Sequence, residues 1–319
     1  ASAGRSDKLV NSVLLFFVTP IQWLSAEDAA RTAVKRAIGL IEKSAATYIE
    51  ERSCFSCHHQ ALTVMALSQS KLAGFTIQDE IVSAQSKFTL EYFTDRKDRL
   101  PKGEGVPGGS YSAGYALAGL AAAKEPADET THALIQYLIK TQKPDGSWRI
   151  RTHRPPLENS HFTATALGLK ATTQTKHAEK ATQWLVKNQA NTNEDHTYKI
   201  LGLYWAGLKE ETRTAAKALL KLQRKDGGWA QLPTMNSDAY ATGQALTVLR
   251  QSGFIKTDYP QYKRGAQWLL KNQKADGSWQ VKTRSKPIQK YFESGFPHGQ
   301  DQFISISATC WAVMALLNQ

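Results

Sequence analysis

Two kinds of helical segment alternate along the chain, and they differ in how their apolar positions are distributed. In one kind, apolar residues recur on one face and charged or amide residues occupy the other, which is typical of a surface helix. In the other kind, small and apolar residues occur nearly all round, which indicates a buried helix. The surface kind is predicted at 28–47, 78–95, 128–142, 177–189, 210–222 and 259–272, and the buried kind at 57–72, 111–124, 161–172, 195–207, 238–252 and 302–318.

The strict alternation of these segments predicts a single all-α domain over residues 27–319. Six buried helices would form an inner ring, and six amphipathic helices would surround them, which is an α6/α6 toroid. A chain of 319 residues is long enough to bury a core of this size.

A turn motif follows three of the amphipathic segments. It reads Gln-x-x-Asp-Gly-x-Trp at 142–148, 223–229 and 273–279, and a degenerate copy at 184–189 lacks the last four positions. Aspartate bonds to nearby backbone amides and glycine accepts a positive φ, so Asp-Gly forms a turn. The glutamine and the tryptophan are expected to tie one helix to the next. A helix with a Thr-Ala-x-Ala-Leu-like sequence follows each of these turns. Sequence repeats of tens of residues indicate stacked helical units.

The turns resemble the QW repeats of the squalene–hopene cyclase and prenyltransferase superfamily. The resemblance covers about residues 28–319 and rests on three good copies and one partial copy. It implies a toroid around an apolar cavity, with functional residues at the N-termini of the inner helices. It is much more specific for the fold than for an activity, because one fold carries many functions.

The acid motif of class II terpene cyclases has no counterpart in this sequence. Those enzymes carry Asp-x-Asp-Asp-Thr-Ala at the start of one inner helix, and the middle aspartate protonates the alkene. Alignment of the inner helices on their Thr-Ala segments places His161, Tyr240 and Ser307 at the proton-donor position. A tyrosine or serine hydroxyl is too weak an acid to protonate an isolated alkene. A proton-initiated cyclase is therefore disfavoured.

A Cys-x-x-Cys-His motif, Cys54-Phe55-Ser56-Cys57-His58, opens the first inner helix. This spacing is the attachment signature of c-type haem. Two thiols bind the vinyl groups, and the following histidine becomes the proximal ligand of the iron. We therefore predict one covalent haem c, anchored by Cys54 and Cys57 and ligated by His58. The next residue, His59, would be either a neighbour that fixes the tautomer of His58 or a surface residue.

The same alignment places the motif at the functional end of the toroid. His58 falls where a cyclase keeps its acid, and the equivalent positions on the other inner helices are Tyr111, His161, Asp195, Tyr240 and Ser307. Tyr240 and His161 are the predicted catalytic or distal residues, and His161 or Met235 is the predicted sixth iron ligand. Helix capping and ordinary packing are the competing interpretations of these residues.

Two further interpretations of the cysteines are weaker. Protein prenyltransferases bind zinc through Asp, Cys and His, and Asp238, Cys310 and His161 or His196 offer these types, but no Asp-x-Cys pair is present. A redox disulfide between Cys54 and Cys57 would normally lie in a thioredoxin-like βαβ unit, which the helical pattern does not provide.

The N-terminal segment and the net charge of the chain bear on where the protein is located and what it binds. Arg5 and Lys8 precede an apolar run at 13–18, and a small residue follows at Ala26, so 1–26 is predicted to be a signal peptide or an N-terminal anchor. No later segment has the pattern of a membrane span. The net charge of +12 favours an anionic partner or surface. Without basic blocks interleaved with aromatic residues, it does not favour nucleic-acid binding.

Together these features predict an exported bacterial monohaem protein, periplasmic or secreted, with membrane association left open. The haem would pass electrons to a periplasmic redox partner, or it would support redox chemistry on an apolar, isoprenoid-like ligand. Only the second role is enzymatic, and the sequence leaves this choice open. The alternative is a haemless terpene cyclase-like or prenyltransferase-like enzyme, or a lipid-binding protein.

Overall fold

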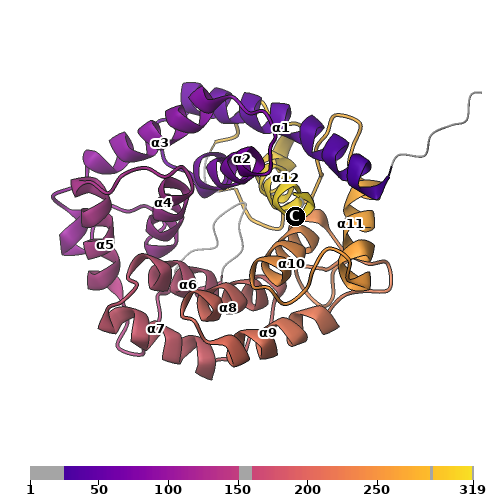
Figure 1. Cartoon of the computed structure of the whole chain (residues 1–319). Helices are drawn as coiled ribbons and strands as arrows, with labels where there is room; N and C mark the ends of the chain where they lie inside the picture. The colour runs from indigo at the N-terminus through magenta and orange to yellow at the C-terminus, as the bar shows by residue number, and fades with distance from the viewer. Residues whose placement is uncertain (1–24, 151–159, 288–289, 318–319) are drawn as a thin grey trace, which may run out of the picture.

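The computed structural model describes residues 25–150, 160–287 and 290–317. Within these residues, helices provide all of the regular secondary structure, and the long helices form two concentric rings (Figure 1). The inner ring consists of η1 (Cys57–Ala61) with α2 (Leu62–Leu72), α4 (Ser110–Ala122), α6 (His161–Ala171), α8 (Asn193–Trp205), α10 (Ala239–Gln251) and α12 (Gln302–Leu316). The outer ring consists of α1 (Ala26–Glu51), α3 (Asp79–Thr94), α5 (Glu129–Thr141), α7 (Lys176–Lys187), α9 (Lys209–Lys221) and α11 (Pro260–Asn272).

The predicted α6/α6 toroid is confirmed. Each of the twelve predicted segments overlaps one of these helices, and most of the ends agree within two or three residues. The last inner helix, α12, packs against both α2 and α10, so the inner ring closes on itself. The predicted signal or anchor segment, 1–26, lies outside the described residues except for Ser25 and Ala26. None of the helices in the described residues is long and apolar enough to cross a membrane.

The two rings differ in burial as the hydrophobic pattern predicts. In α10 every residue from Ala239 to Leu249 is buried, whereas α7 buries only Ala181, Trp184 and Leu185. Neighbouring inner helices approach closely where one of them carries glycine. A Cβ atom on Gly243 of α10 would lie 2.7 Å from backbone atoms of α12, so a larger residue at this position would push the two helices apart.

The three complete turn motifs make the same set of hydrogen bonds. The indole N–H of each tryptophan donates to a carbonyl oxygen of the preceding outer helix, at 2.7–2.9 Å; the pairs are Trp148–Leu138, Trp229–Leu219 and Trp279–Leu269. The glutamine side chain donates to the glycine carbonyl of its own turn and to a carbonyl of the next outer helix. In the last turn Gln273 reaches Ala33 of α1 at 2.8 Å, which closes the outer ring. The predicted role of the motif as a tie between helices is confirmed.

Candidate functional site

The hydrogen bonds of the turns give the true register of the inner helices. The backbone N–H of each motif tryptophan donates to a threonine hydroxyl of the following inner helix, and these threonines are Thr165, Thr242 and Thr309. The alignment from sequence used Thr163 in place of Thr165, so it is wrong by two residues in α6. The cause is the local sequence Thr163-Ala164-Thr165-Ala166, in which Thr-Ala occurs twice and allows two registers.

His161 therefore occupies a different position from the one predicted. Its Nδ1 accepts a hydrogen bond from the backbone N–H of Ile150 at 3.3 Å, two residues after the motif tryptophan. In the last repeat, Ser305 accepts from Val281 in the same way, at 3.1 Å. Burial, followed by the charge of Arg149, lowers the pKa of His161. The structure thus places His161 against the turn, and it is Thr163 that corresponds to Tyr240.

A buried carboxylate that the sequence analysis missed lies at the N-terminal end of the inner helices. Glu194 of α8 is 3% exposed and accepts hydrogen bonds from three side chains on two other inner helices. Thr163 donates to Oε1 at 2.9 Å, while Tyr240 and Gln244 donate to Oε2 at 3.0 and 2.7 Å. Tyr240 thus bonds to a carboxylate from the neighbouring repeat, and its catalytic or distal role stays a prediction.

Glu194 was overlooked because the alignment selected the adjacent Asp195. In the structure Asp195 accepts from the Ser160 hydroxyl at 2.7 Å and from the backbone N–H groups of Asn191 and Thr192 at 3.1 Å. Asp195 thus belongs to a capping box, as its capping interpretation predicted. The sequence feature that could have indicated Glu194 is its position directly before Asp195, in the first turn of a helix whose next turns are mostly apolar.

A cluster of three tyrosines lies next to this carboxylate. The hydroxyls of Tyr115 and Tyr198 are 2.5 Å apart, and the ring of Tyr111 lies 5.0 Å from that of Tyr115. Burial raises the pKa of all three phenols, and the charge of Glu194 raises them further. These hydroxyls are therefore neutral hydrogen-bonding groups at any physiological pH. The Tyr111 hydroxyl has no hydrogen-bond partner among the described residues.

The Cys-x-x-Cys-His segment lies between α1 and α2. Cys54 is half-buried, with its Sγ 3.5 Å from the Tyr48 hydroxyl, while Cys57 is buried where η1 begins. Cys57 is close enough to Tyr111 and Tyr198 to influence their ionisation, so the motif borders the tyrosine cluster. None of Cys54, Cys57 and Cys310 forms a disulfide in the structure, so the motif cysteines are not joined to each other.

The two histidines of the segment are buried and contact each other. Nδ1 of His58 meets Nδ1 of His59, and Nε2 of His59 lies 3.1 Å from the Ser44 hydroxyl. His59 has no exposed surface, so its interpretation as a surface residue is wrong, and its tautomer-fixing role stays a prediction. Burial, followed by the proximity of His58, lowers the pKa of His59 well below its usual value.

The donor set of this segment suits a covalent haem. Two thiols three residues apart, not joined by a disulfide, precede His58. Nδ1 of His58 contacts His59, and Nε2 is the atom that haem iron takes in such a geometry. A zinc site has less support, because the described residues hold no group of three or more His, Cys, Asp and Glu placed to bind a metal ion. Cys310 is fully buried within α12, and burial raises its pKa.

Met235, the other predicted sixth ligand, lies in a connection between helices, as does His298. Met235 is in the loop before α10, and Arg224 ties this loop to the second turn by donating to the Pro233 carbonyl at 2.8 Å. His298 lies before α12 and its Nε2 is 2.6 Å from the Ser278 hydroxyl of the third turn. Met235 as a sixth iron ligand stays a prediction.

A cavity of about 300 Å³ runs along the axis at the opposite end of the inner helices. All six inner helices contribute to its wall, which includes Met65, Leu167, Leu201, Trp205, Trp311 and Met314. Along α8, Glu194, Tyr198, Leu201 and Trp205 follow at helical spacing, so the axis changes from polar at one end to apolar at the other. Tyr198 lines the cavity and separates it from the Glu194 cluster.

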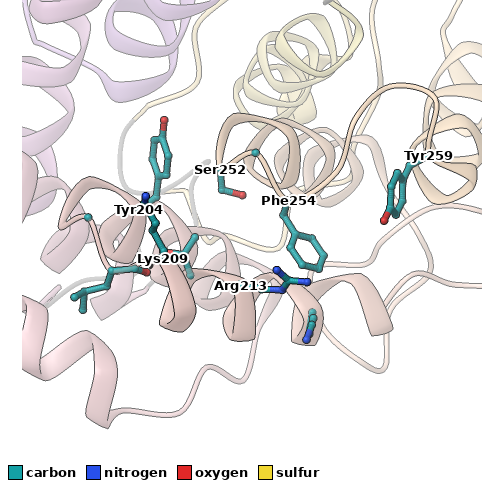
Figure 2. A pocket seen from close by; sticks show the side chains of 11 residues that line it. Tyr204, Lys209, Arg213, Ser252, Phe254 and Tyr259 are labelled. Atoms are coloured by element: carbon teal, nitrogen blue, oxygen red, sulfur yellow. Dashed lines mark hydrogen bonds between the residues drawn. The ribbon is translucent and has the colours of Figure 1, made fainter.

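A second hollow, of about 570 Å³, opens outside the inner ring (Figure 2). It is formed by α9 and by the connections that follow α8 and α10. Its lining includes Lys209, Arg213 and Lys217 together with Tyr204, Phe254 and Tyr259. The hollow is basic and exposed, and only one stretch of the toroid builds it.

The fold is an α/α toroid similar to that of terpene cyclases. The family model of the squalene–hopene cyclase C-terminal domain matches residues 202–319. The chain is also 28% identical to the squalene–hopene cyclase of Bradyrhizobium diazoefficiens over 38% of its own length, and it spans only a fifth of that enzyme.

Solved structures of similar fold cover nearly the whole chain. The type II terpene cyclase MstE from Scytonema, in complex with merosterolic acid A, superposes with a TM-score of 0.60 at 16% identity over 91% of this chain and 97% of that one. A possible GH105 family member from Salmonella enterica gives 0.54 at 13% identity over 97% and 98%. At these identities the likeness is one of fold, and the fold is shared by proteins of different kinds.

Asp238 offers a test of burial at the rim of the inner ring. It caps α10 by accepting the Ala241 N–H at 2.9 Å. Burial, which outweighs these hydrogen bonds, raises the pKa of Asp238 from 3.8 to about 6. The folded protein therefore holds this proton to a higher pH than the unfolded chain, and stability should fall as the pH rises from about 4 to 6.

Asp238→Asn should remove this pH dependence while keeping the cap, because asparagine caps as well as aspartate. A pKa difference of about two units between the folded and unfolded protein changes the free energy of unfolding by roughly 2–3 kcal/mol. Urea unfolding of both proteins at pH 4 and pH 7 measures the effect, and the difference between them cancels the other titrating groups. Parallel pH profiles for the two proteins would show that Asp238 titrates normally.

Proposed function

We propose that this protein binds an amphipathic, isoprenoid-like ligand in its axial cavity. The observation that carries the proposal is the construction of the cavity, because all six inner helices contribute to its mainly apolar wall. Its volume of about 300 Å³ lies at the lower end of the range for small-ligand sites. Structures of similar fold support the same ligand class, since MstE has been seen with geranylgeranyl dihydroxybenzoate as substrate.

The charges of the cavity favour a ligand with an anionic end. Lys124 and Lys170 are the charged side chains among the described lining residues, and no carboxylate accompanies them there. The ammonium of Lys170 lies 4.6 Å from the centre of the Trp205 ring, at the mouth. A phosphate or carboxylate at this mouth would pair with the lysines while its apolar tail filled the interior.

The proposal is one of binding and not of proton-initiated cyclisation. The Asp-x-Asp-Asp motif is missing, and the one carboxyl group of the interior cluster accepts hydrogen bonds from three neutral donors. Both oxygens of this carboxyl group are thus occupied by side chains of α6 and α10. Glu194 is therefore suited to hold Tyr240 and Gln244 in place and poorly suited to protonate an alkene.

Geranylgeranyl phosphate is the probe for a binding test by titration calorimetry. Ala121→Phe should weaken binding by at least about tenfold, or 1.4 kcal/mol, because Ala121 lines the mouth and a phenyl ring would occupy it. Ala121 is exposed, so the change should not disturb folding. Lys170→Met should weaken binding of the phosphate but not of geranylgeraniol, which has the same tail without the charge.

The matched control is Arg213→Met, which removes a cation from the outer hollow. It should leave the affinity for both probes unchanged. Unaltered binding in Ala121→Phe, or loss of binding in Arg213→Met alone, would place the ligand outside the axial cavity. No measurable binding of either probe would contradict the proposal.

The second candidate is a covalent haem c at Cys54, Cys57 and His58. The spacing of the two thiols, which no disulfide joins, and the His58–His59 contact support it. Each Sγ–H would add across one vinyl group, forming an S–C bond while the hydrogen passes to the neighbouring carbon, without an oxidant or a reductant. When bound, the group would supply one-electron redox chemistry. The test is the intact mass of the protein made in a host that attaches haem c.

A further inference from the structure

A chain of hydrogen bonds leads from the backbone of Ser294 to the motif histidine. The Ser44 hydroxyl donates to the Ser294 carbonyl oxygen at 2.7 Å. A hydroxyl has one hydrogen, so Ser44 acts as an acceptor toward its second partner. That partner is Nε2 of His59, at 3.1 Å, and Nε2 of His59 therefore carries a proton.

The tautomer of His59 determines the tautomer of His58. A neutral imidazole protonated on Nε2 has a lone pair on Nδ1, which accepts a hydrogen bond. The partner of this Nδ1 is Nδ1 of His58, which must then be the donor. In a neutral His58 the proton lies on Nδ1, and Nε2 carries the lone pair.

Packing holds both rings in this arrangement. The Tyr48 ring stacks on His59 with centroids 4.6 Å apart and planes inclined by 22°, and the Phe303 ring lies 5.2 Å from that of His58. The Ser56 hydroxyl accepts the backbone N–H of His59 at 3.1 Å, which anchors the start of η1. Among the described residues, no carboxylate contacts the His59 ring.

We infer that His59 is a positioning residue, which Ser44 orients and which holds His58 in the Nδ1–H tautomer with Nε2 presented as a metal ligand. The inference rests on the proposed haem site and deepens it, because the ligand histidine of such a site needs an unprotonated Nε2. Ligand histidines usually donate Nδ1–H to a carbonyl or a carboxylate. Here the acceptor is a second imidazole, whose own tautomer is set by a serine.

The first test is the tautomer itself, measured on the full chain produced without haem attachment. Nitrogen-15 NMR should report a proton on Nδ1 of His58 and on Nε2 of His59 at a pH where both rings are neutral. Ser44→Ala should give mixed tautomers for both rings, because His59 loses its acceptor. A proton on Nε2 of His58 in the unaltered protein would overturn the inference, whether or not the protein takes up haem.

The second test uses the reduction potential of the haem-loaded protein. An acceptor on Nδ1–H makes the ligand more basic and favours oxidised iron, so His59→Leu should raise the potential. A tenfold change in the equilibrium corresponds to 59 mV for one electron. His59→Gln should restore most of the shift through its amide oxygen, and Ser44→Ala should shift the potential in the same direction by less.

His177→Ala is the control, because Nδ1 of His177 bonds to Gln142 in an outer turn at 2.6 Å and not to the motif. Its potential should match that of the unaltered protein. If His59→Leu, His59→Gln and His177→Ala all give the same potential, His59 has no positioning role. It is possible to find the expected tautomers by NMR while neither the unaltered protein nor any variant carries haem. In that case the haem proposal fails and the tautomer assignment stands.

Discussion

Replacing Cys54 and Cys57 by alanine is expected to abolish covalent haem while leaving the toroid folded. Each thioether needs its own sulfur, and no other thiol lies in the motif. The double variant removes one half-buried and one buried sulfur at the edge of the inner ring, so the loss of packing is small. Intact mass and haem staining after denaturation measure attachment, and far-UV circular dichroism measures folding.

The third cysteine provides the control. Cys310 is fully buried in α12, where burial raises the pKa of its thiol, so it is not available for attachment. Cys310→Ala should therefore keep one haem per chain. Haem that survives denaturation in the double variant would show that the motif is not the anchor, and an unaltered protein without haem would rule out the second candidate function.

Replacing Trp279 by alanine is expected to have the largest effect on stability. The side chain is fully buried, and its indole N–H donates to the Leu269 carbonyl at 2.7 Å. Truncation of a buried tryptophan costs about 3–5 kcal/mol and here leaves that carbonyl without its donor. Typical domains are stable by about 5–15 kcal/mol, so a large part of the total would be lost.

Trp268→Ala is the matched comparison. Trp268 is only partly buried, and its indole N–H donates to Asp226 at 3.2 Å on the outside of the ring. We expect a loss of about 1 kcal/mol, the value of one exposed hydrogen bond with some packing. Urea unfolding followed by circular dichroism compares the two. Equal midpoints would mean that Trp279 of the turn motif does not secure the packing of α11 against α12.

The errors in the predicted site have one geometric origin. Successive residues of an α-helix point about 100° apart, so a shift of one or two positions turns a side chain from the axis to the rim. This shift exchanged Glu194 for Asp195 and Thr163 for His161. The residues before the inner helices are polar in several consecutive positions, and their chemistry does not say which one faces inward.

The sequence by itself determined the twelve helices, their alternation and their closure into a toroid. Apolar periodicity distinguishes a helix buried all round from one with a solvated face, and the repeated Asp-Gly-x-Trp turn ties one outer helix to the next. These signals are local or repeat at a fixed spacing, so they can be read along the chain. The pattern Cys54-x-x-Cys57-His58 was likewise visible without a structure.

Only the tertiary structure decided which side chains meet inside the ring. Glu194, Tyr240 and Thr163 come from three different inner helices, and Ser44, His59 and Ser294 come from segments about 15 and 235 residues apart along the chain. Hydrogen bonds of this kind depend on the rotation and depth of each helix after packing. Those quantities are set by contacts across the whole ring and leave no pattern in any single segment.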